Sequence, residues 1–185
     1  METLKVHVGA GKNYAEGWVN TDIGDHKKDI YWDLREVSPF DNDSADFIFC
    51  EHVIEHLTFA EGVALLKEFF RIMKKGAIAR VSTLDLDAIL NEDMDAGFIE
   101  RFARHSSANF KYRSQVFNRI FYGYGHRCIF DDRLLKKSAY LGGFKFKNMT
   151  RFSGNDSQLP EVFNIDRRIK GKTTVFDNLV LEVKK

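Results

Sequence analysis

The sequence lacks several features that mark specialised classes of protein. Its two cysteines, Cys50 and Cys128, show no Cys-x-x-Cys spacing, which argues against a disulfide framework or a zinc knuckle and indicates reduced thiols. No apolar run is long enough to span a bilayer, so we expect no membrane span. The first residues, Met-Glu-Thr-Leu-Lys, lack the apolar core of a signal peptide, and we therefore expect a cytoplasmic protein.

Acidic residues are absent from one long segment, residues 101–130, although the formal net charge of the whole chain is only +1. The strong bases of this segment are Arg101, Arg104, Lys111, Arg113, Arg119 and Arg127, and aromatic residues lie between them. A basic, aromatic segment without acids suits an anionic or sugar-like partner. A solvated basic helix face over an aromatic core explains the same pattern, and the sequence leaves both interpretations open.

The strongest local signal is a short apolar run that ends in Gly-x-Gly, from Leu4 to Gly11. It predicts a buried strand that enters a tight turn, where glycine lets the backbone approach a ligand without a Cβ in the way. Open α/β sheets bind nucleotide-like ligands at such a turn. Gly9 and Gly11 would fit the same pattern if they only closed the turn and approached no ligand.

The elements expected along the chain alternate between strands and helices. The predicted strands are Leu4–Gly9, Trp18–Ile23, Ile30–Trp32, Ala45–Cys50, Ala77–Leu84, Phe144–Phe152 and Thr174–Val183. A Thr58/Glu61 capping box begins a helix that ends near Gly76, and Asp131 begins another that ends at Gly142-Gly143. Further helical segments are expected from Leu86 to about Arg104, whereas residues 11–17 leave room only for an abbreviated helix or a turn.

This alternation predicts one α/β domain over residues 1–185, with 44% hydrophobic residues to form its core. We expect a Rossmann-like, mostly parallel sheet with helices on both faces and an antiparallel edge strand formed by the final pair. Residues 91–130 are expected to form an insertion on the substrate side. The polar segment 153–173 is expected to be a lid or loop.

The order of motifs resembles a known family. The motifs are Val-His-Val-Gly-Ala-Gly-Lys-Asn, Gly-Trp-Val-Asn-Thr-Asp, Trp-Asp-Leu-Arg-Glu, Phe-Cys-Glu-His-Val-Ile-Glu-His-Leu and Ser-Thr-Leu-Asp-Leu, followed by Gly-His-Arg and Gly-Gly-Phe. Together they resemble a class I S-adenosylmethionine-dependent methyltransferase, in particular a compact bacterial subgroup of the methyltransferase type 11 kind. The resemblance extends to about residue 146 and implies S-adenosylmethionine as the cofactor.

The resemblance also implies roles for individual residues. Gly9 and Gly11 would pass under the methionine part of the cofactor, and Asp22 would accept hydrogen bonds from the ribose hydroxyls. Asp33 and Leu34 would lie beside the adenine. The complete set implied to contact the cofactor is His7, Gly9, Ala10, Gly11, Asp22, Ile23, Asp33, Leu34, Cys50, Glu51 and His52. Asp22 could instead be a turn or cap residue, and a loop aspartate such as Asp33 needs no ligand.

Two departures from the family pattern concern the first motif. His7 stands where the family usually has an acid, and Asn13 replaces the third glycine. The partner of the cofactor's ammonium group is therefore not apparent from the sequence. A third departure, Lys74-Lys75-Gly76-Ala77 in place of Lys-Pro-Gly-Gly, changes a turn and no reactive group.

Methyl transfer from a sulfonium requires mainly the alignment of a nucleophile with the S–CH₃ bond, at about 3–3.5 Å. A hydroxyl acceptor also needs a base, for which His126, Asp85 and His56 are the candidates. Arg127 and Tyr124 are expected to contact the substrate. Purely structural roles are the alternatives. Residues 126–127 would then form a turn whose side chains cap the next helix, and His56 would only donate a hydrogen bond to a backbone carbonyl.

The run His52-Val-Ile-Glu55-His56 matches the inverted zinc-peptidase pattern H-x-x-E-H. That pattern requires both histidines on one helical face and a third ligand on a nearby helix. Because Thr58 marks the start of the helix, residues 52–56 are expected to precede it. We therefore expect no zinc peptidase and no metal ion.

Three function classes follow from these observations. The favoured class is a methyltransferase whose acceptor is a small molecule or a saccharide, with anionic acceptors included and no membrane partner. A nucleic-acid methyltransferase is the first alternative, although no appended RNA-binding domain or Asn-Pro-Pro-Tyr-type motif is visible. The second alternative is a non-catalytic domain that binds the cofactor or acts as a partner subunit, which the replacement of the motif acid by His7 supports. The sequence predicts no oligomeric state.

Overall fold

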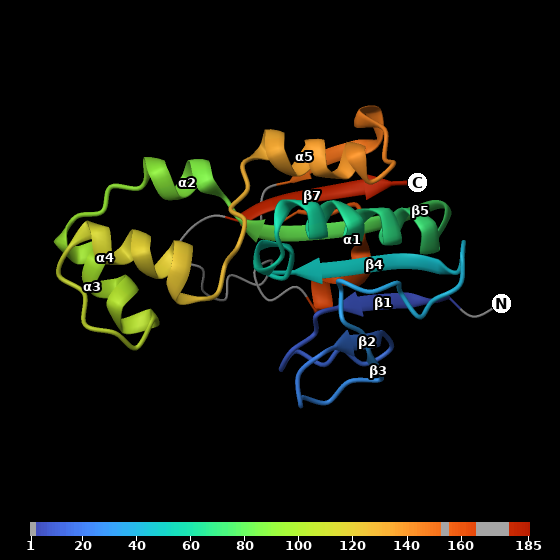
Figure 1. Cartoon of the computed structure of the whole chain (residues 1–185), viewed down its shortest axis with the longest axis horizontal. Helices are drawn as coiled ribbons and strands as arrows, with labels where there is room; N and C mark the ends of the chain where they lie inside the picture. Colours follow the sequence, from blue (N-terminus) through green and yellow to red (C-terminus); the bar gives the residue numbers. More distant parts are fainter. Residues whose placement is uncertain (1–2, 153–155, 166–177) are drawn as a thin grey trace.

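A seven-stranded sheet forms the centre of the computed structural model, which describes residues 3–152, 156–165 and 178–185 (Figure 1). The strand order is β3-β2-β1-β4-β5-β7-β6. The strands are β1 (Lys5–Val8), β2 (Val19–Asp22), β3 (Ile30–Tyr31), β4 (Ala45–Glu51), β5 (Met73–Leu84), β6 (Met149–Phe152) and β7 (Asn178–Lys184). Strands β1 to β5 pair in parallel, whereas β7 is antiparallel to both β5 and β6. The predicted parallel sheet with an antiparallel edge is confirmed.

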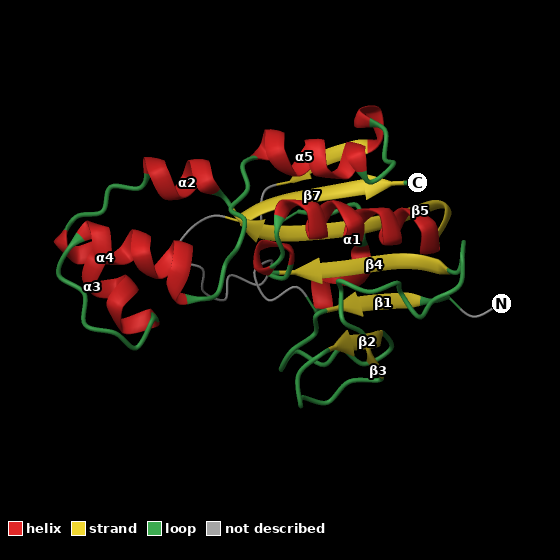
Figure 2. Cartoon of the chain, viewed as in Figure 1, coloured by secondary structure: helices red, strands yellow, loops and turns green. Residues whose placement is uncertain are grey.

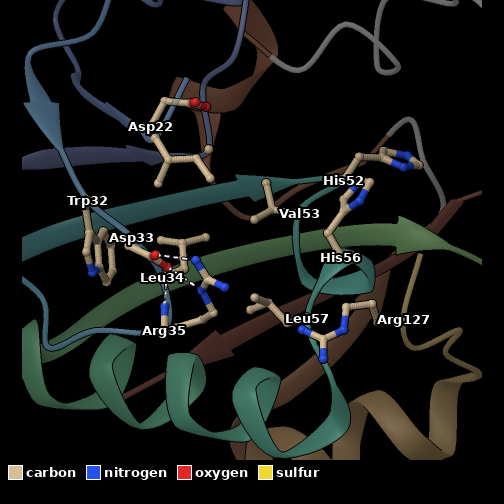
Figure 3. Close-up of a pocket in the computed structure, with 12 residues that line it drawn as sticks. Asp22, Trp32, Asp33, Leu34, Arg35, His52, Val53, His56, Leu57 and Arg127 are labelled. Carbon is tan, nitrogen blue, oxygen red and sulfur yellow. Dashed lines mark hydrogen bonds and ion pairs between the residues drawn. The ribbon is translucent and has the colours of Figure 1, made fainter. Parts of the chain in front are cut away.

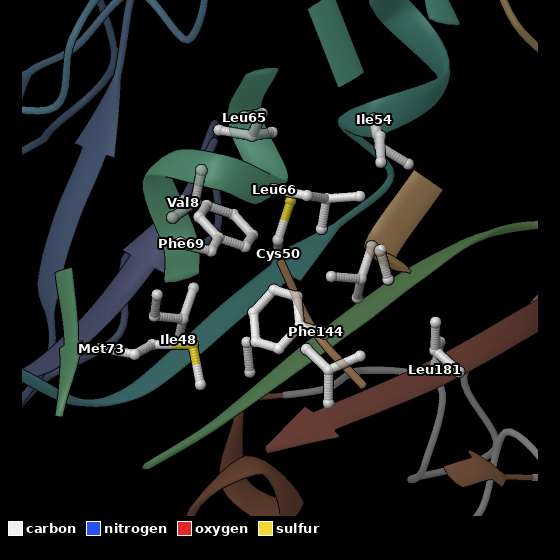
Figure 4. Packing of buried hydrophobic residues seen from close by; sticks show 14 of the residues in the cluster. Val8, Ile48, Cys50, Ile54, Leu65, Leu66, Phe69, Met73, Phe144 and Leu181 are labelled. Carbon is white, nitrogen blue, oxygen red and sulfur yellow. The ribbon is translucent and has the colours of Figure 1, made fainter. Parts of the chain in front are cut away.

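The side chains of β4 alternate between the two faces of the sheet, as its period of two requires. Ile48 and Cys50 enter the larger core, together with side chains from α1 (Phe59–Ile72) and α5 (Asp132–Leu141) (Figure 4). Phe47 and Phe49 pack on the opposite face. Both long helices therefore lie on the same face, and they pack side by side (Figure 2).

The opposite face is covered by smaller elements. Trp18, Leu159 and Val162 pack against Phe49 there, and the last of these belongs to the short 3₁₀ helix η4 (Pro160–Asn164). Residues 11–17, between β1 and β2, form turns, as their length predicted. In the part of the chain that the structure describes, the helical cover on this side is thus a single 3₁₀ turn.

Helix α1 begins at the predicted capping box. The Thr58 side chain accepts from the Glu61 N–H at 3.3 Å, and the Glu61 carboxylate accepts from the Thr58 N–H at 2.7 Å. The predicted end at Gly76 is wrong, because the helix stops at Ile72 and β5 already starts at Met73. Gly76 (φ +86°) instead lies within the strand, where its N–H donates to the carbonyl of Lys185.

Four helical elements follow β5 and form a separate unit beyond the carboxyl ends of the strands (Figure 1). They are α2 (Leu86–Asn91), α3 (Ala96–His105), α4 (Arg113–Asn118) and the π-helical turn η2 (Arg119–Gly123). This unit has its own core, made by Ile89, Met94, Phe98, Ile99, Phe102, Val116 and Ile120. Its two ends meet where Asp85 and Phe130 form an isolated parallel bridge.

The last elements differ from their predicted bounds. The expected strand Phe144–Phe152 begins with the 3₁₀ turn η3 (Phe146–Asn148), and only Met149–Phe152 is extended. Helix α5 begins as predicted, with Asp131 as its N-cap, because the Asp131 side chain accepts from the Leu134 N–H at 2.6 Å. Most of the predicted lid, 153–173, lies outside the described residues. Among the described residues, no helix combines the length and apolarity that a bilayer span requires.

Candidate functional site

A cavity of about 470 Å³ opens at the carboxyl ends of the parallel strands (Figure 3). This size lies within the usual range of about 300–1,000 Å³ for ligand pockets. Its lining comes from the segments that follow β1, β2, β3 and β4, and from the loop after η2. The lining residues are Gly9, Asp22, Ile23, Trp32, Asp33, Leu34, Arg35, His52, Val53, His56, Leu57 and Arg127.

The floor of the cavity is the glycine turn after β1. Gly9 and Gly11 have φ values of +65° and +53°, in the left-handed region that favours glycine. A Cβ on Gly9 would lie only 2.3 Å from Cγ2 of Val53, so a side chain at this position would displace Val53. The turn is fixed to β2 by a hydrogen bond from the Ala10 N–H to the Thr21 carbonyl at 3.0 Å.

Asp22 ends β2 and faces the same turn. Its Oδ2 accepts from the Gly11 N–H at 2.8 Å, and its Oδ1 accepts from the Gly24 N–H at 2.6 Å. These two bonds fix the orientation of the carboxylate. Because each carboxylate oxygen has two acceptor sites, one on each remains for a ligand. The structural role as a turn residue and the predicted ligand role are therefore compatible.

Asp33 forms the adjoining wall, after β3. Its carboxylate accepts from the Arg35 side chain at two atoms, Nε at 2.9 Å and Nη2 at 2.5 Å (Figure 3). This pairing lowers the pKa of the Asp33 carboxyl to about 2. Apolar side chains complete this end of the cavity, contributed by Ile23, Trp32 and Leu34. A carboxylate beside an apolar slot can accept from a ring amine while the ring packs on the aliphatic groups.

His52 and the fully buried Glu55 stand at the other end of the cavity. His52 has a left-handed backbone (φ +51°), its Nδ1 lies 2.7 Å from Glu55 Oε1, and its Nε2 lies 3.1 Å from Asn178 Oδ1. Burial opposes ionisation of Glu55, but His52, the Glu55 backbone and the charge of His56 together outweigh burial and lower the pKa of the carboxyl. The His52 contact has the distance of an ion pair without the alignment of a hydrogen bond, so both Glu55 oxygens lack a hydrogen-bond partner.

Three further residues gather beside this pair. His56 lines the cavity, and its ring centroid lies 4.9 Å from that of His126. His126 Nδ1 lies 2.5 Å from the Ile120 carbonyl oxygen, and partial burial lowers the pKa of its ring despite this bond. Arg127 also lines the cavity, where its Nη1 is 3.1 Å from Glu61 Oε2. The structure thus brings two of the predicted bases and one predicted substrate contact together.

Other predicted site residues lie elsewhere. The buried ring of His7 packs on Phe49, on the face of the sheet away from α1, with Nδ1 3.1 Å from Asn20 Oδ1. Cys50 is fully buried in the larger core, and burial raises the pKa of its thiol. Neither residue lines the cavity, nor do the predicted Ala10, Gly11 and Glu51.

Asp85, a predicted base, is also outside the cavity lining. It caps α2 by accepting from the Asp87 N–H at 3.0 Å, and its Oδ2 pairs with Arg151 Nη2 at 2.7 Å. The predicted substrate contact Tyr124 is 38% exposed, and its hydroxyl forms a hydrogen bond with Ser106 Oγ at 2.8 Å. The Asp85 carboxylate is therefore engaged, whereas the Tyr124 ring still borders His126, with ring centroids 5.7 Å apart.

Four of the lining residues were not predicted from the sequence, namely Trp32, Arg35, Val53 and Leu57. Trp32 and Arg35 flank the predicted pair Asp33 and Leu34, so their place in the motif was the available signal. Val53 lies beside Gly9, which is distant in the sequence, and no local sequence pattern predicts this contact.

Comparison with known proteins agrees with this geometry. Residues 21–81 match the family described as "Methyltransferase domain", whereas no curated protein matches the chain. A SAM-dependent methyltransferase from Archaeoglobus fulgidus is 15% identical, with a TM-score of 0.56 over 99% of this chain and 86% of that one. A SAM-dependent methyltransferase from Thermotoga maritima is 15% identical, with a TM-score of 0.58 over 100% and 83%. The plantazolicin methyltransferase BpumL, solved in complex with SAH, is 10% identical, with a TM-score of 0.56 over 99% and 76%.

These solved structures share the fold of the whole chain, and the matched segment adds evidence from the sequence itself. It extends from the end of β2 into β5 and includes Asp22, Asp33, Leu34, His52 and His56. Most of the cavity lining thus falls within the matched segment. Residues 21–81 are thus similar to a methyltransferase domain, and the chain shares the fold of solved S-adenosylmethionine-dependent methyltransferases.

Proposed function

We propose that the enzyme transfers the methyl group of S-adenosylmethionine to a small-molecule or saccharide acceptor, with the cofactor in the cavity between Asp22 and His52. The observation that carries the proposal is the convergence of the predicted cofactor contacts. Gly9, Asp22, Ile23, Asp33, Leu34 and His52 all line one cavity. They come from four separate strand ends, so the sequence order alone did not bring them together.

The donor set fits the cofactor. Asp22 keeps free acceptor sites that suit two ribose hydroxyls, since its backbone bonds use only one site on each oxygen. Asp33 and the apolar Leu34 and Ile23 suit the exocyclic amine and the ring of adenine. The bound cofactor supplies an activated methyl on a sulfonium, and the chain's task is to align the acceptor with it.

The acceptor end is assigned to His56, His126 and Arg127. Because Nδ1 of His126 must donate its hydrogen to the Ile120 carbonyl, Nε2 is the nitrogen that can receive a proton from the acceptor. A lowered pKa keeps this ring neutral at pH 7, as a base requires. Arg127 supports an anionic acceptor, because its guanidinium lines the cavity and is only partly paired with Glu61.

Calorimetry with S-adenosylmethionine and its demethylated product tests the cofactor assignment. Asp22→Ala is expected to weaken binding by about 1.5–3 kcal/mol, or about ten-fold or more, because it removes charge-assisted hydrogen bonds. Asp25→Ala is the matched control, since Asp25 is exposed in the same loop and does not line the cavity. Equal affinity in the wild type and Asp22→Ala would contradict the assignment.

Transfer of a labelled methyl group from the cofactor to a panel of acceptors tests the acceptor class. Small hydroxylated or anionic molecules and saccharides are expected to be labelled. If RNA or DNA is labelled instead, with binding that weakens steeply as salt increases, the nucleic-acid alternative replaces the proposed class. Cofactor binding without labelling of any acceptor would favour the non-catalytic alternative.

A further inference from the structure

Glu55, His56 and His126 place three metal-binding groups close together beside the cofactor cavity. One donor atom from each residue can be chosen so that all three lie within 4.8 Å of one another. Two atoms bound to one ion at about 2.1 Å lie at most about 4.2 Å apart. The three donor groups therefore lie close to the separation that one shared ion requires, and the His56 ring is exposed.

The Glu55 carboxylate is the most informative member of the set. Its side chain is 0% exposed, yet neither of its oxygens has a hydrogen-bond partner. Buried carboxylates are normally satisfied by hydrogen bonds, charges or metals, because desolvation is costly. His52 compensates the charge from one side only, at 2.7 Å from Oε1. An ion on the side of His56 and His126 would occupy the remaining acceptor sites.

The backbone joins the two segments that carry the donors. Glu55 and His56 belong to the 3₁₀ turn η1 (Ile54–His56), whereas His126 follows η2. The Glu55 carbonyl accepts from the N–H groups of Arg127 and Cys128, at 2.7 and 3.1 Å. The donors are therefore held in place before any ligand arrives, as an effective metal site requires.

The hydrogen bond of His126 prepares one of its nitrogens for a metal. Its Nδ1 lies 2.5 Å from the carbonyl oxygen of Ile120, and a carbonyl can only accept, so Nδ1 carries the hydrogen. The lone pair is then on Nε2. Metal-binding histidines usually donate their second N–H to a carbonyl or carboxylate in this way.

We propose that Glu55, His56 and His126 bind one divalent transition-metal ion, such as Zn²⁺, Co²⁺ or Mn²⁺. Two imidazoles and one carboxylate suit such ions and leave coordination positions open. The sequence predicted no metal, because the His52–His56 run precedes the helix. The structure agrees that the run precedes α1, but the third donor comes from a distant loop and not from a helix.

The role of the ion rests on the proposed function. An open coordination position beside the cavity would bind the acceptor oxygen and lower the pKa of its hydroxyl, and the proton would leave to solvent. The oxygen would then form the bond to the methyl carbon, while the S–C bond breaks and its electron pair remains on sulfur. With an ion present, His56 and His126 act as its ligands rather than as bases.

Metal binding is tested without cofactor or acceptor, so that its outcome is independent of the methyl-transfer assay. The chelator-treated chain is titrated with Co²⁺ followed by visible absorption, and with Zn²⁺ followed by calorimetry. One ion per chain is expected. His126→Ala, His56→Ala and Glu55→Gln are each expected to weaken binding at least ten-fold, with circular dichroism to verify folding. Glu55→Gln nearly preserves the volume of the side chain, so it remains informative if an alanine variant misfolds.

Two control variants separate this site from adventitious binding. His26→Ala removes an exposed histidine outside the set, and Cys128→Ser removes the partly exposed thiol next to Arg127. Both are expected to keep the one-to-one stoichiometry and the affinity of the wild type. The proposal is overturned if no ion binds stoichiometrically, or if His126→Ala and Glu55→Gln bind as tightly as the wild type. Cofactor affinity measured on the same variants shows separately whether the cavity assignment stands.

Discussion

Gly9 and Val53 are in such close contact that a single added carbon on Gly9 would lie 2.3 Å from Cγ2 of Val53. The two residues follow β1 and β4, neighbouring parallel strands, and both line the cavity. The absence of a side chain at Gly9 thus lets the glycine turn lie directly against the segment that carries His52, Glu55 and His56.

Gly9→Ala is expected to destabilise the protein and to weaken cofactor binding. The left-handed backbone costs an alanine about 1–2 kcal/mol, and the forced displacement of Val53 adds about 1–3 kcal/mol. The free energy of unfolding, measured by urea denaturation, is the primary readout. The sum of the two costs gives an expected loss of about 2–5 kcal/mol in the free energy of unfolding.

A double-mutant cycle with Val53→Ala separates the two causes. Removing both γ-carbons of Val53 eliminates the clash but leaves the backbone strain, so Gly9→Ala should cost about 1–2 kcal/mol in the Val53→Ala background. If Gly9→Ala costs the same in both backgrounds, the contact with Val53 does not constrain the turn.

Arg80 and Glu182 form an ion pair inside the sheet, where both side chains are 0% exposed and their strands are in direct register. Arg80 Nη1 donates to Glu182 Oε1 at 3.0 Å and to the Asp156 carbonyl at 2.8 Å. Arg80→Met leaves a buried carboxylate without its charge partner, which is expected to cost about 3–5 kcal/mol of unfolding free energy. Thermal and urea unfolding provide the measurement.

The exposed pair Arg104 and Glu100 is a matched control, because both side chains are more than half exposed. Arg104→Met is expected to cost less than about 1 kcal/mol. The double variant Arg80→Met/Glu182→Met should regain part of the loss of Arg80→Met, since the Glu182 carboxylate is no longer buried without Arg80. A small loss of unfolding free energy in Arg80→Met would mean that solvent reaches the Arg80–Glu182 pair.

Burial lowers the pKa of His7, although the bond with Asn20 and the charge of Asp22 oppose the shift. The unfolded chain therefore takes up a proton near pH 6.5 that the folded chain does not bind. The free energy of unfolding is expected to fall as the pH drops below about 6.5, by at most about 1.4 kcal/mol per pH unit for this one proton.

His7→Gln tests this contribution, because glutamine cannot titrate but can still bond to Asn20. Urea denaturation between pH 7.5 and 5 should give a smaller pH slope than in the wild type, and His26→Gln, at an exposed position, should retain the wild-type slope. His126 also has a lowered pKa, so part of the slope will persist. If the pH slope of the unfolding free energy is unchanged in His7→Gln, His7 has the same pKa in the folded and the unfolded chain.

His126→Ala is expected to lower kcat by about 10²-fold or more, whether the ring acts as a base or binds an ion. The Kd of S-adenosylmethionine should change little, because His126 does not line the cavity. Single-turnover methyl transfer and calorimetry give the two values. A loss of cofactor affinity with unchanged turnover would move His126 from the acceptor end to the cofactor end.

Local patterns in the sequence predicted most of the fold. The Thr58/Glu61 box and Asp131 begin their helices as expected, because capping depends on residues within one turn. The end of α1 at Ile72 was missed because β4 recruits Met73 into the sheet through pairing with Ala45, a long-range contact. Pairing between strands overrides the local preference of glycine for a helix stop.

The position of Asp22, Asp33 and His52 at one edge of the sheet could also be predicted, since each lies at or just after the end of a strand that the pattern identifies. His7 and Cys50 were less predictable, because the two faces of a buried strand look alike in sequence and register decides which side chains face the core. The proximity of Glu55 and His126 had no sequence signal at all. It depends on the backbone hydrogen bonds that attach the loop after η2 to η1.

The helical unit from α2 to η2 leaves the sheet and returns to it at one place, where Leu86 N–H donates to the Phe130 carbonyl at 3.0 Å. Because its ends are neighbours and most of its hydrophobic interior comes from its own helices, insertions or deletions between α2 and α4 are expected to leave the order of the strands unchanged.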